Sequence, residues 1–241
     1  MAIPPIYYAI LEACNQPGCP VCRMVEHSNE RYLDNLLYEN VNDGELRNHL
    51  RHSLGFCNRH AWQLLEFGDV LGISIIYHDI LGNVLKNLPE GALPDQEAGW
   101  LPSLLNKVPR SLASKQEIAV QALKPDARCP ACEQEDRTVE IILSELTSAL
   151  QNEELSAALS NSTGLCLPHL CQAFQHTRET GSFNQLLSIS RNKIEGLHQE
   201  LAEFIRKSDY RFRQEGLGSE RDSGRRAIRI AVGERRVAPR E

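Results

Sequence analysis

The chain has 241 residues, of which 41% are hydrophobic, so it can bury a sizeable core without metals or disulfides. Its formal net charge of −6 argues against a general nucleic-acid binder. The N-terminus lacks the basic start of a secretory signal, and the most apolar stretch, residues 70–85, is too short to span a membrane. We therefore expect a cytoplasmic protein that contacts neither membranes nor nucleic acid.

The spacing of apolar residues is helical throughout, and no stretch alternates as a strand would. The expected helical stretches are 5–15, 58–87 with breaks near Gly68 and Gly72, 113–124, and 167–207 with a break at 180–182. Prolines in 88–112 predict a linker, and 209–241, with nine Arg and six acidic residues, predicts a mobile or loosely docked tail. The sequence thus predicts an all-α fold.

A pair of cysteine motifs occurs twice. Cys19-Pro-Val-Cys22 recurs 110 residues later as Cys129-Pro-Ala-Cys132, and Gly55-Phe-Cys57-Asn-Arg-His60 recurs 109 residues later as Gly164-Leu-Cys166-Leu-Pro-His169. Residues between the motifs, such as Glu30 and Glu140, also match. We interpret the pattern as a duplication. It predicts an N-terminal copy (1–87) and a C-terminal copy (113–208), each a helical bundle.

Cysteine and histidine in these spacings are typical ligands of structural zinc, which prefers a tetrahedral set of sulfur and imidazole donors. The predicted ligands are Cys19, Cys22, Cys57 and His60 in the N-terminal copy and Cys129, Cys132, Cys166 and His169 in the C-terminal copy. A helical hairpin that returns on itself would join the two motifs of one copy. We therefore expect two zinc ions, each held by three cysteines and one histidine of a single copy.

Other interpretations of the cysteines fit less of the pattern. Cys14 with Cys19, Cys22 and Cys57 has the C-x₄-C-x₂-C…C spacing of plant-type iron–sulfur proteins, but Lys124 stands at the position equivalent to Cys14. A thioredoxin-like role would need a βαβ pattern, and a catalytic zinc would need an open ligand position. We expect no enzyme activity. Cys14 and Cys171 lie outside the repeated set and are expected in the core.

The motifs resemble those of an uncharacterised family of bacterial proteins with paired C-P-x-C and G-F/L-C-x-x-H segments. The resemblance would cover most of the chain and implies no known activity. Two functions stay open. One is a non-enzymatic, zinc-stabilised helical scaffold that binds a protein partner. The other is a thiol-based redox or metal-responsive sensor that uses the same thiolates.

Overall fold

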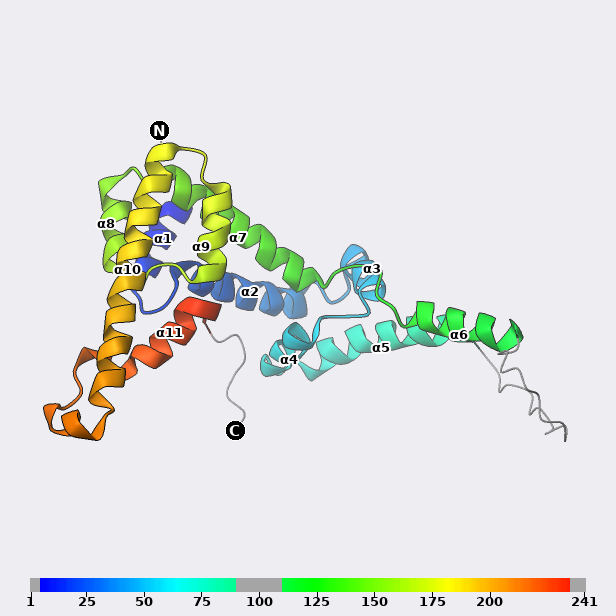
Figure 1. Cartoon of the computed structure of the whole chain (residues 1–241). Helices are drawn as coiled ribbons and strands as arrows, with labels where there is room; N and C mark the ends of the chain where they lie inside the picture. Colours follow the sequence, from blue (N-terminus) through cyan, green and yellow to red (C-terminus); the bar gives the residue numbers. More distant parts are fainter. Residues whose placement is uncertain (1–4, 90–109, 235–241) are drawn as a thin grey trace. The chain divides into compact units, whose positions relative to one another are not determined.

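The computed structural model describes residues 5–89 and 110–234, and within them the chain forms eleven α-helices, two short 3₁₀ helices and no strand (Figure 1). The predicted all-α fold is confirmed. The helices are α1 (Pro5–Cys14), α2 (Pro20–Glu39), α3 (Gly44–His52), α4 (Asn58–Glu66), α5 (Val70–Asn87), α6 (Arg110–Ala122), α7 (Pro130–Ala149), α8 (Glu153–Asn161), α9 (Leu167–His176), α10 (Thr180–Lys207), η1 (Tyr210–Glu215), η2 (Ser219–Asp222) and α11 (Ser223–Val232).

The chain divides into two compact units. Unit 1 comprises Met1–Arg31 and Gln134–Glu241, and unit 2 comprises Tyr32–Glu133. The boundary falls inside α2 and α7, so each unit takes segments from both predicted copies. This division differs from the predicted one at 1–87 and 113–208, because each Cys-x-x-Cys segment belongs to the unit formed mainly by the other copy. Residues 90–109 of the predicted linker 88–112 lie outside the described residues.

Each unit has its own hydrophobic core. In unit 1, Leu146 and Leu155 are among the fully buried side chains that join α7 and α8 to α1. In unit 2, Leu50 and Ile76 are buried in a core shared by α2, α3, α4 and α5. Full burial of one such side chain stabilises a fold by about 1.5–3 kcal/mol. Both units can therefore gain packing energy in addition to any that a metal contributes.

The helix breaks differ in detail from those predicted. Gly68 does end a helix, since it separates α4 from α5, but Gly72 lies buried within the first turn of α5, where its N–H bonds the Asp69 side chain at 2.9 Å. In the C-terminal copy the break precedes residues 180–182, because Thr177 already caps the end of α9. Ser182 then has no exposed surface and lies in the first turn of α10.

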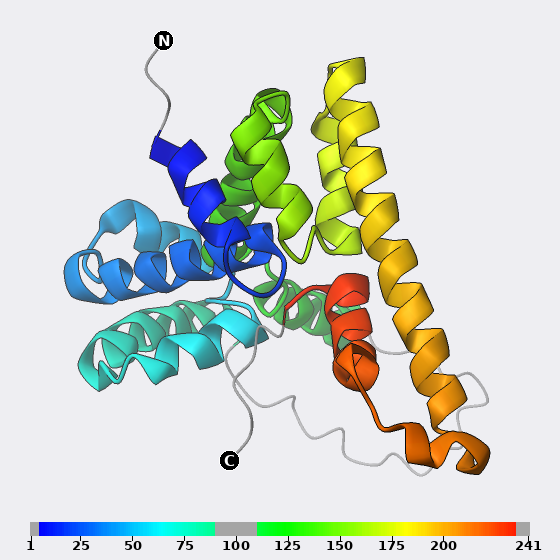
Figure 2. The same ribbon diagram turned by 90° about the vertical axis from the view of Figure 1, so that its left-hand side faces the viewer.

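The Arg-rich segment after residue 208 is largely helical, which differs from the predicted mobile or loosely docked tail. It forms η1, η2 and α11, and α11 contacts both α9 and α10 (Figure 2, red). Arg226 pairs with Glu200 of α10, and Lys207 pairs with Glu220 at 2.9 Å. Acidic partners on the chain itself thus neutralise part of the positive charge. Residues 235–241 of the predicted tail lie outside the described residues.

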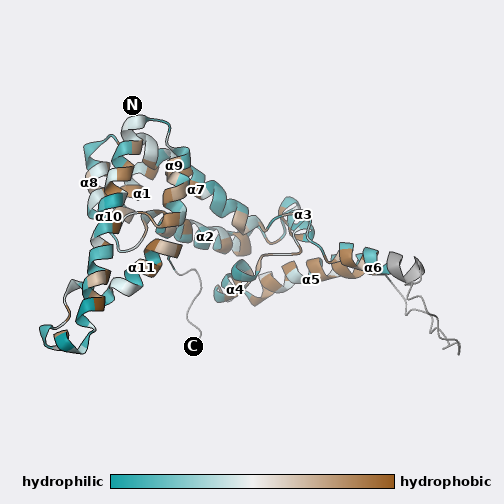
Figure 3. Cartoon of the chain, in the orientation of Figure 1, coloured by the Kyte–Doolittle hydropathy of each residue, from teal (hydrophilic) through white to brown (hydrophobic). Residues whose placement is uncertain are grey.

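Much of helix α5 is apolar (Figure 3), and its apolar side chains lie on two faces, one buried and one exposed. Its inner face buries Ile76 and Ile80 in the core of unit 2. Its outer face carries four aliphatic side chains that are exposed by 59–72%, namely Val70, Leu71, Leu81 and Leu85. Even so, none of the helices in the described ranges has the length and apolarity to cross a bilayer.

Candidate metal centre

All four cysteine motifs lie at the starts of helices. The first cysteine of each Cys-x-x-Cys directly precedes a helix that begins with proline, α2 at Pro20 and α7 at Pro130. Proline suits this first position because its fixed φ is helical and its missing N–H has no role there. Cys57 and Cys166 are the N-cap residues of α4 and α9, and neither side chain caps its helix. Their sulfurs are therefore available to other groups.

The second ligand of each motif follows three residues later, on the same side of the helix. Backbone N–H groups at helix starts carry partial positive charge and favour a thiolate over a thiol. Gly55 and Gly164 have φ of +94° and +84° just before their motifs, a backbone conformation that favours glycine. Each motif thus presents two donor atoms at an electropositive helix end.

The eight predicted ligands form two clusters, but the pairing differs from the prediction. Cluster 1, in unit 1, consists of Cys19, Cys22, Cys166 and His169, and cluster 2, in unit 2, consists of Cys57, His60, Cys129 and Cys132. Within each cluster the donor atoms all lie within 4.8 Å of one another. The prediction that each copy closes its own set of three cysteines and one histidine is therefore wrong. Each cluster joins the Cys-x-x-Cys of one copy to the Cys-x-x-His of the other.

The lengths of the helices explain this exchange of motifs, in which each Cys-x-x-Cys pairs with the Cys-x-x-His of the other copy. Helix α2 has 20 residues and runs about 30 Å away from its Cys-x-x-Cys at the standard rise, whereas α3 has 9 residues and returns only about 14 Å. The two helices alone therefore leave Cys57, which follows α3, about 16 Å short of Cys22. Helices α7 and α8 have the same two lengths, so the C-terminal copy has the same mismatch. A hairpin within one copy would need arms of equal length.

Short loop contacts hold each Cys-x-x-Cys turn in its place. The Gly18 N–H donates to the Thr163 hydroxyl at 3.0 Å, next to the Cys-x-x-His of the other copy. In unit 2 the N–H groups of Asp126 and Ala127 donate to the His52 carbonyl at 3.0 and 3.3 Å. The Asp126 carboxylate also lies 3.0 Å from His52 Nδ1. Both turns are thus bonded to the end of the short helix that precedes the partner motif.

The spacing of the donor atoms fits a tetrahedral ion. Zinc bonds of about 2.3 Å to sulfur and about 2.0–2.1 Å to nitrogen imply edges of about 3.8 Å between sulfurs and about 3.6 Å between sulfur and nitrogen. In cluster 1, Cys22 and Cys166 Sγ are 3.7 Å apart, and the three sulfurs lie 3.2–3.6 Å from His169 Nδ1. In cluster 2, the Cys57–Cys132 edge is 3.6 Å, and the distances to His60 Nδ1 are 3.4–3.5 Å.

The protonation of cluster 1 is strongly shared among its members. Hydrogen bonds from the Cys166 and Cys19 thiols hold the pKa of Cys22 well below its ordinary value, with a smaller contribution from the Glu234 backbone N–H. Burial lowers the pKa of His169, but the Cys166 and Cys22 sulfurs outweigh it and raise that pKa to about 9. The cluster without metal therefore favours one thiolate beside a charged imidazole.

In cluster 2, too, the pKa of one cysteine is lowered and that of another is raised. Burial opposes ionisation of Cys129, but hydrogen bonds from His60 and from the backbone N–H groups of Cys57 and Cys132 lower its pKa to about 6. Burial and the charge of Cys129 raise the pKa of Cys132 to about 12. Three thiolates at this distance need a cation between them. Metal binding to either cluster would accordingly release protons.

The two remaining cysteines lie outside both clusters. Cys14 is buried in the core of unit 1, as predicted, and burial raises its pKa to about 11. Cys171 is exposed, so the prediction that it lies in the core is wrong. The buried face of α9 is formed by His169, Leu170 and Ala173, and Cys171 points away from it. Neither cysteine adds a donor to a cluster.

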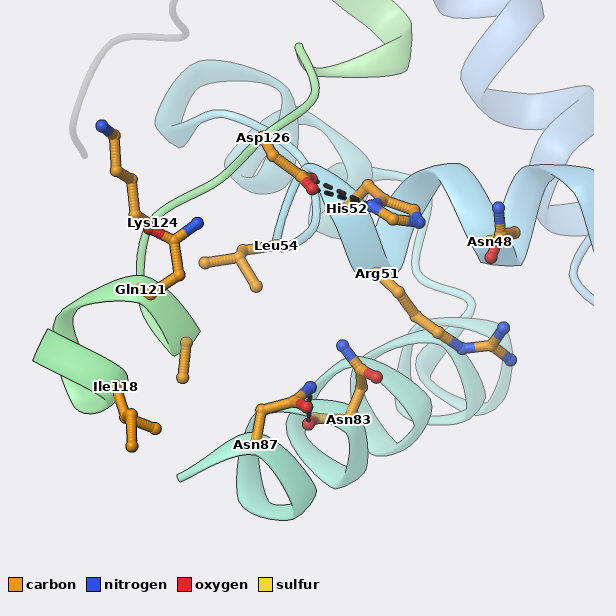
Figure 4. Close-up of a pocket in the computed structure, with 11 residues that line it drawn as sticks. Asn48, Arg51, His52, Leu54, Asn83, Asn87, Ile118, Gln121, Lys124 and Asp126 are labelled. Carbon is orange, nitrogen blue, oxygen red and sulfur yellow. Dashed lines mark hydrogen bonds and ion pairs between the residues drawn. The ribbon is translucent and has the colours of Figure 1, made fainter. Parts of the chain in front are cut away.

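A cavity of about 450 Å³ lies in unit 2 between α3, α5 and α6 (Figure 4). Amide side chains, among them Asn48, Asn87 and Gln121, line it, and the His52–Asp126 pair stands at its edge. These three amides are exposed, so the cavity is open rather than enclosed. Asp126, which lines the cavity, belongs to the loop that leads into Cys129.

Comparison with known proteins gives a match over nearly the whole chain. A family of unknown function (DUF6062) matches residues 5–237. The chain is also 27% identical over 203 residues to an uncharacterized 23.9 kDa protein in the xynA 3' region of Caldicellulosiruptor sp. (strain Rt8B.4), which covers 84% of this chain and 88% of the relative. No solved structure matches. The predicted resemblance to an uncharacterised family is confirmed.

Proposed function

The chain belongs to the family of unknown function (DUF6062), and since membership supplies no activity, we propose from its two clusters that it is a non-enzymatic helical scaffold stabilised by two zinc ions. The observation that carries the proposal is the approach of eight donor atoms, from four distant segments, into two sets with tetrahedral edges. Zinc held by four protein ligands acts as a cross-link and has no open position for a reacting water.

The donor set supports zinc over an iron–sulfur cluster. Each set contains an imidazole nitrogen, and Cys14, which the iron–sulfur spacing would require, belongs to the core and to neither cluster. Sulfur and imidazole donors at tetrahedral spacing are the usual ligands of structural zinc. The free state of all eight cysteines also supports a cytoplasmic location, because paired thiols this close would oxidise in a secretory compartment.

The outer face of α5 supports a protein partner. Val70, Leu71, Leu81 and Leu85 are exposed along it, with Ser74 and His78 between them and no Lys, Arg, Asp or Glu. A helix that is apolar on two faces usually packs on both of them. Such a face suits an apolar protein surface, whereas nucleic acid would require a basic one.

Elemental analysis of the purified full-length protein tests the proposal. We expect two zinc ions per chain and no visible chromophore, and we expect a chelator to remove the zinc with loss of helical circular dichroism. Replacing Cys57 or Cys166 by Ala should remove one zinc each, whereas Cys14→Ala and Cys171→Ala should keep both. Unchanged stoichiometry in the Cys57 and Cys166 variants, or a brown iron-containing protein, would contradict the proposal.

A further inference from the structure

The two clusters contain the same types of ligand, three cysteines and one histidine, but differ in how far two of their sulfurs are shielded from solvent. In cluster 1, Cys22 and Cys166 are 4% and 1% exposed. The cysteines at the equivalent sequence positions in cluster 2, Cys132 and Cys57, are only half-buried. Because the ligands are alike, the difference must come from the segments that lie over the sulfurs.

The C-terminal segment provides the cover of cluster 1. Helix α11 ends at Val232, and Gly233 follows with a φ of +88°. A Cβ atom at Gly233 would lie 3.1 Å from Cys22 Sγ and 3.6 Å from Cys166 Sγ, so only glycine lets the backbone approach both sulfurs. The next backbone N–H, that of Glu234, donates to Cys22. We call Gly233 and Glu234 the cap.

The cap is held from both sides. The Glu234 carboxylate pairs with Arg229 at 3.2 Å and lies against Gly18, where a Cβ atom would collide with it. Beside the cap, an open depression of about 550 Å³ is bordered by Cys22, His27 and Glu234. Displacement of the cap would therefore expose Cys22 toward solvent on that side.

Cluster 2 has no equivalent of the cap among the described residues. Cys57 and Cys132 remain partly exposed, and their sulfurs are 3.6 Å apart, close enough for a small movement to join them. Reactivity of cysteine toward peroxide follows thiolate character and exposure. Metal ligation supplies the thiolate character in both clusters, so exposure decides which pair reacts.

We propose that Cys57 and Cys132 form a dithiol that reacts with hydrogen peroxide or an organic hydroperoxide. The cap prevents the same reaction at Cys22 and Cys166 by covering their sulfurs. This inference rests on the proposed zinc occupancy. One thiolate attacks the peroxide, whose O–O bond breaks to give a sulfenic acid and, after one proton is taken up, water from hydrogen peroxide or an alcohol from an organic hydroperoxide. The other thiolate then attacks the sulfenic sulfur, and hydroxide leaves as water with a second proton. The two sulfurs lose two electrons, the peroxide gains them, and cluster 2 loses two ligands.

The test measures zinc release from the full-length zinc protein under hydrogen peroxide, with a chromophoric chelator as indicator. A Cys171→Ser background removes the exposed thiol outside the clusters. We expect one zinc per chain in a fast phase, together with a Cys57–Cys132 disulfide found by mass spectrometry after alkylation. The second zinc should leave in a separate, slower phase. Dithiothreitol with added zinc should restore the original stoichiometry.

Three variants make the test specific. Cys57→Ser should be purified with the zinc of cluster 1 alone and should show only the slow phase, which assigns the fast phase to cluster 2. Gly233→Val should displace the cap and move the second zinc into the fast phase. Gly224→Ala is the control, because it lies in α11, the helix that precedes Gly233, with no contact within 4 Å of its added Cβ, and it should behave as the parent protein.

The outcomes separate this inference from the proposed function. Protein that contains no zinc when purified would contradict both. Release of two zinc ions in a single phase, or a fast phase that survives in Cys57→Ser, would overturn the reactive dithiol while leaving the scaffold proposal intact. A slow phase that is unchanged in Gly233→Val would overturn the role of the cap.

Discussion

The hydroxyls of Ser28 and Thr138 lie 3.3 Å apart although 110 residues separate them in the chain. The same offset relates Cys19 to Cys129 and Cys22 to Cys132. The contact between α2 and α7 in unit 1 therefore joins equivalent positions of the two proposed copies.

The pairing of ligands can be read from zinc stoichiometry in double variants. Cys19→Ala with Cys166→Ala damages only cluster 1, so we expect one zinc to remain. Cys19→Ala with Cys57→Ala damages both clusters, so we expect none. If the motifs paired within each copy, the two results would be interchanged. Each double variant is thus the control for the other.

A break in the chain between the copies should be tolerated while metal is present. Each cluster takes two ligands from residues before 90 and two from residues after 109. A protease site introduced between residues 89 and 110 should therefore yield two fragments that elute together in size-exclusion chromatography. Addition of a chelator should make them separate or aggregate. Fragments that part while zinc is still bound would contradict the exchange of motifs.

The two faces of α5 should respond differently to truncation. Ile76 is 1% exposed, and Ile76→Ala should cost about 2–5 kcal/mol of unfolding free energy through lost contacts and a cavity. Leu81, on the same helix, is 59% exposed, and Leu81→Ala should change that free energy by no more than about 0.5 kcal/mol. Denaturant unfolding of the zinc protein measures both values. A large cost at Leu81 would mean that the outer face is needed for the fold.

Docking of the C-terminal segment should depend on pH through Glu220. Its carboxylate accepts hydrogen bonds from the Gly218 N–H and from Lys207, which lower its pKa from 4.5 to about 2. A pKa that is lower in the folded state means that the stabilisation is complete above about 4.5 and is lost as the pH falls toward 2. Glu220→Gln should therefore speed hydrogen exchange in residues 219–232 at pH 7.

The difference between Glu220→Gln and the parent protein should shrink below pH 4.5, after correction for intrinsic exchange rates. The control is Glu195→Gln, which removes an exposed pair with Arg191 on α10. Because exposed pairs contribute little, this variant should match the parent protein at every pH. A difference for Glu220→Gln that persists unchanged to low pH would exclude the carboxylate as its cause.

The sequence predicted which residues form the two clusters but not how they pair. Matched spacing identified all eight donor residues, and helical periodicity predicted the fold class. The pairing depends on the unequal lengths of α2 and α3, which are set where Asp43 caps α3 through a 2.7 Å bond to the Leu46 N–H. Asn152 caps α8 in the same way. Both are common helix-capping residues, so the sequence already indicated where α3 and α8 begin. Those helix starts argue against the expected hairpin within one copy.

Three other features of the structure could not be predicted from the residues around them in the sequence. Cys171 sits in an apolar stretch, and only the orientation of α9 shows that it faces solvent. The docking of α11 depends on individual pairs such as Arg226 with Glu200, which overall composition does not reveal. Gly233 gave no pattern either, because its role comes from the approach of the backbone to two sulfurs that are distant in sequence.

The exchanged motifs also set an order for synthesis on the ribosome. A nascent chain that has reached residue 89 carries half of both ligand sets and can complete neither. Cluster 2 can close once Cys132 has left the exit tunnel, and cluster 1 only after His169 has followed. The cap arrives last, with Gly233. Until Cys132 and then His169 have emerged, the early cysteines depend on the redox state and metal supply of the surrounding cell.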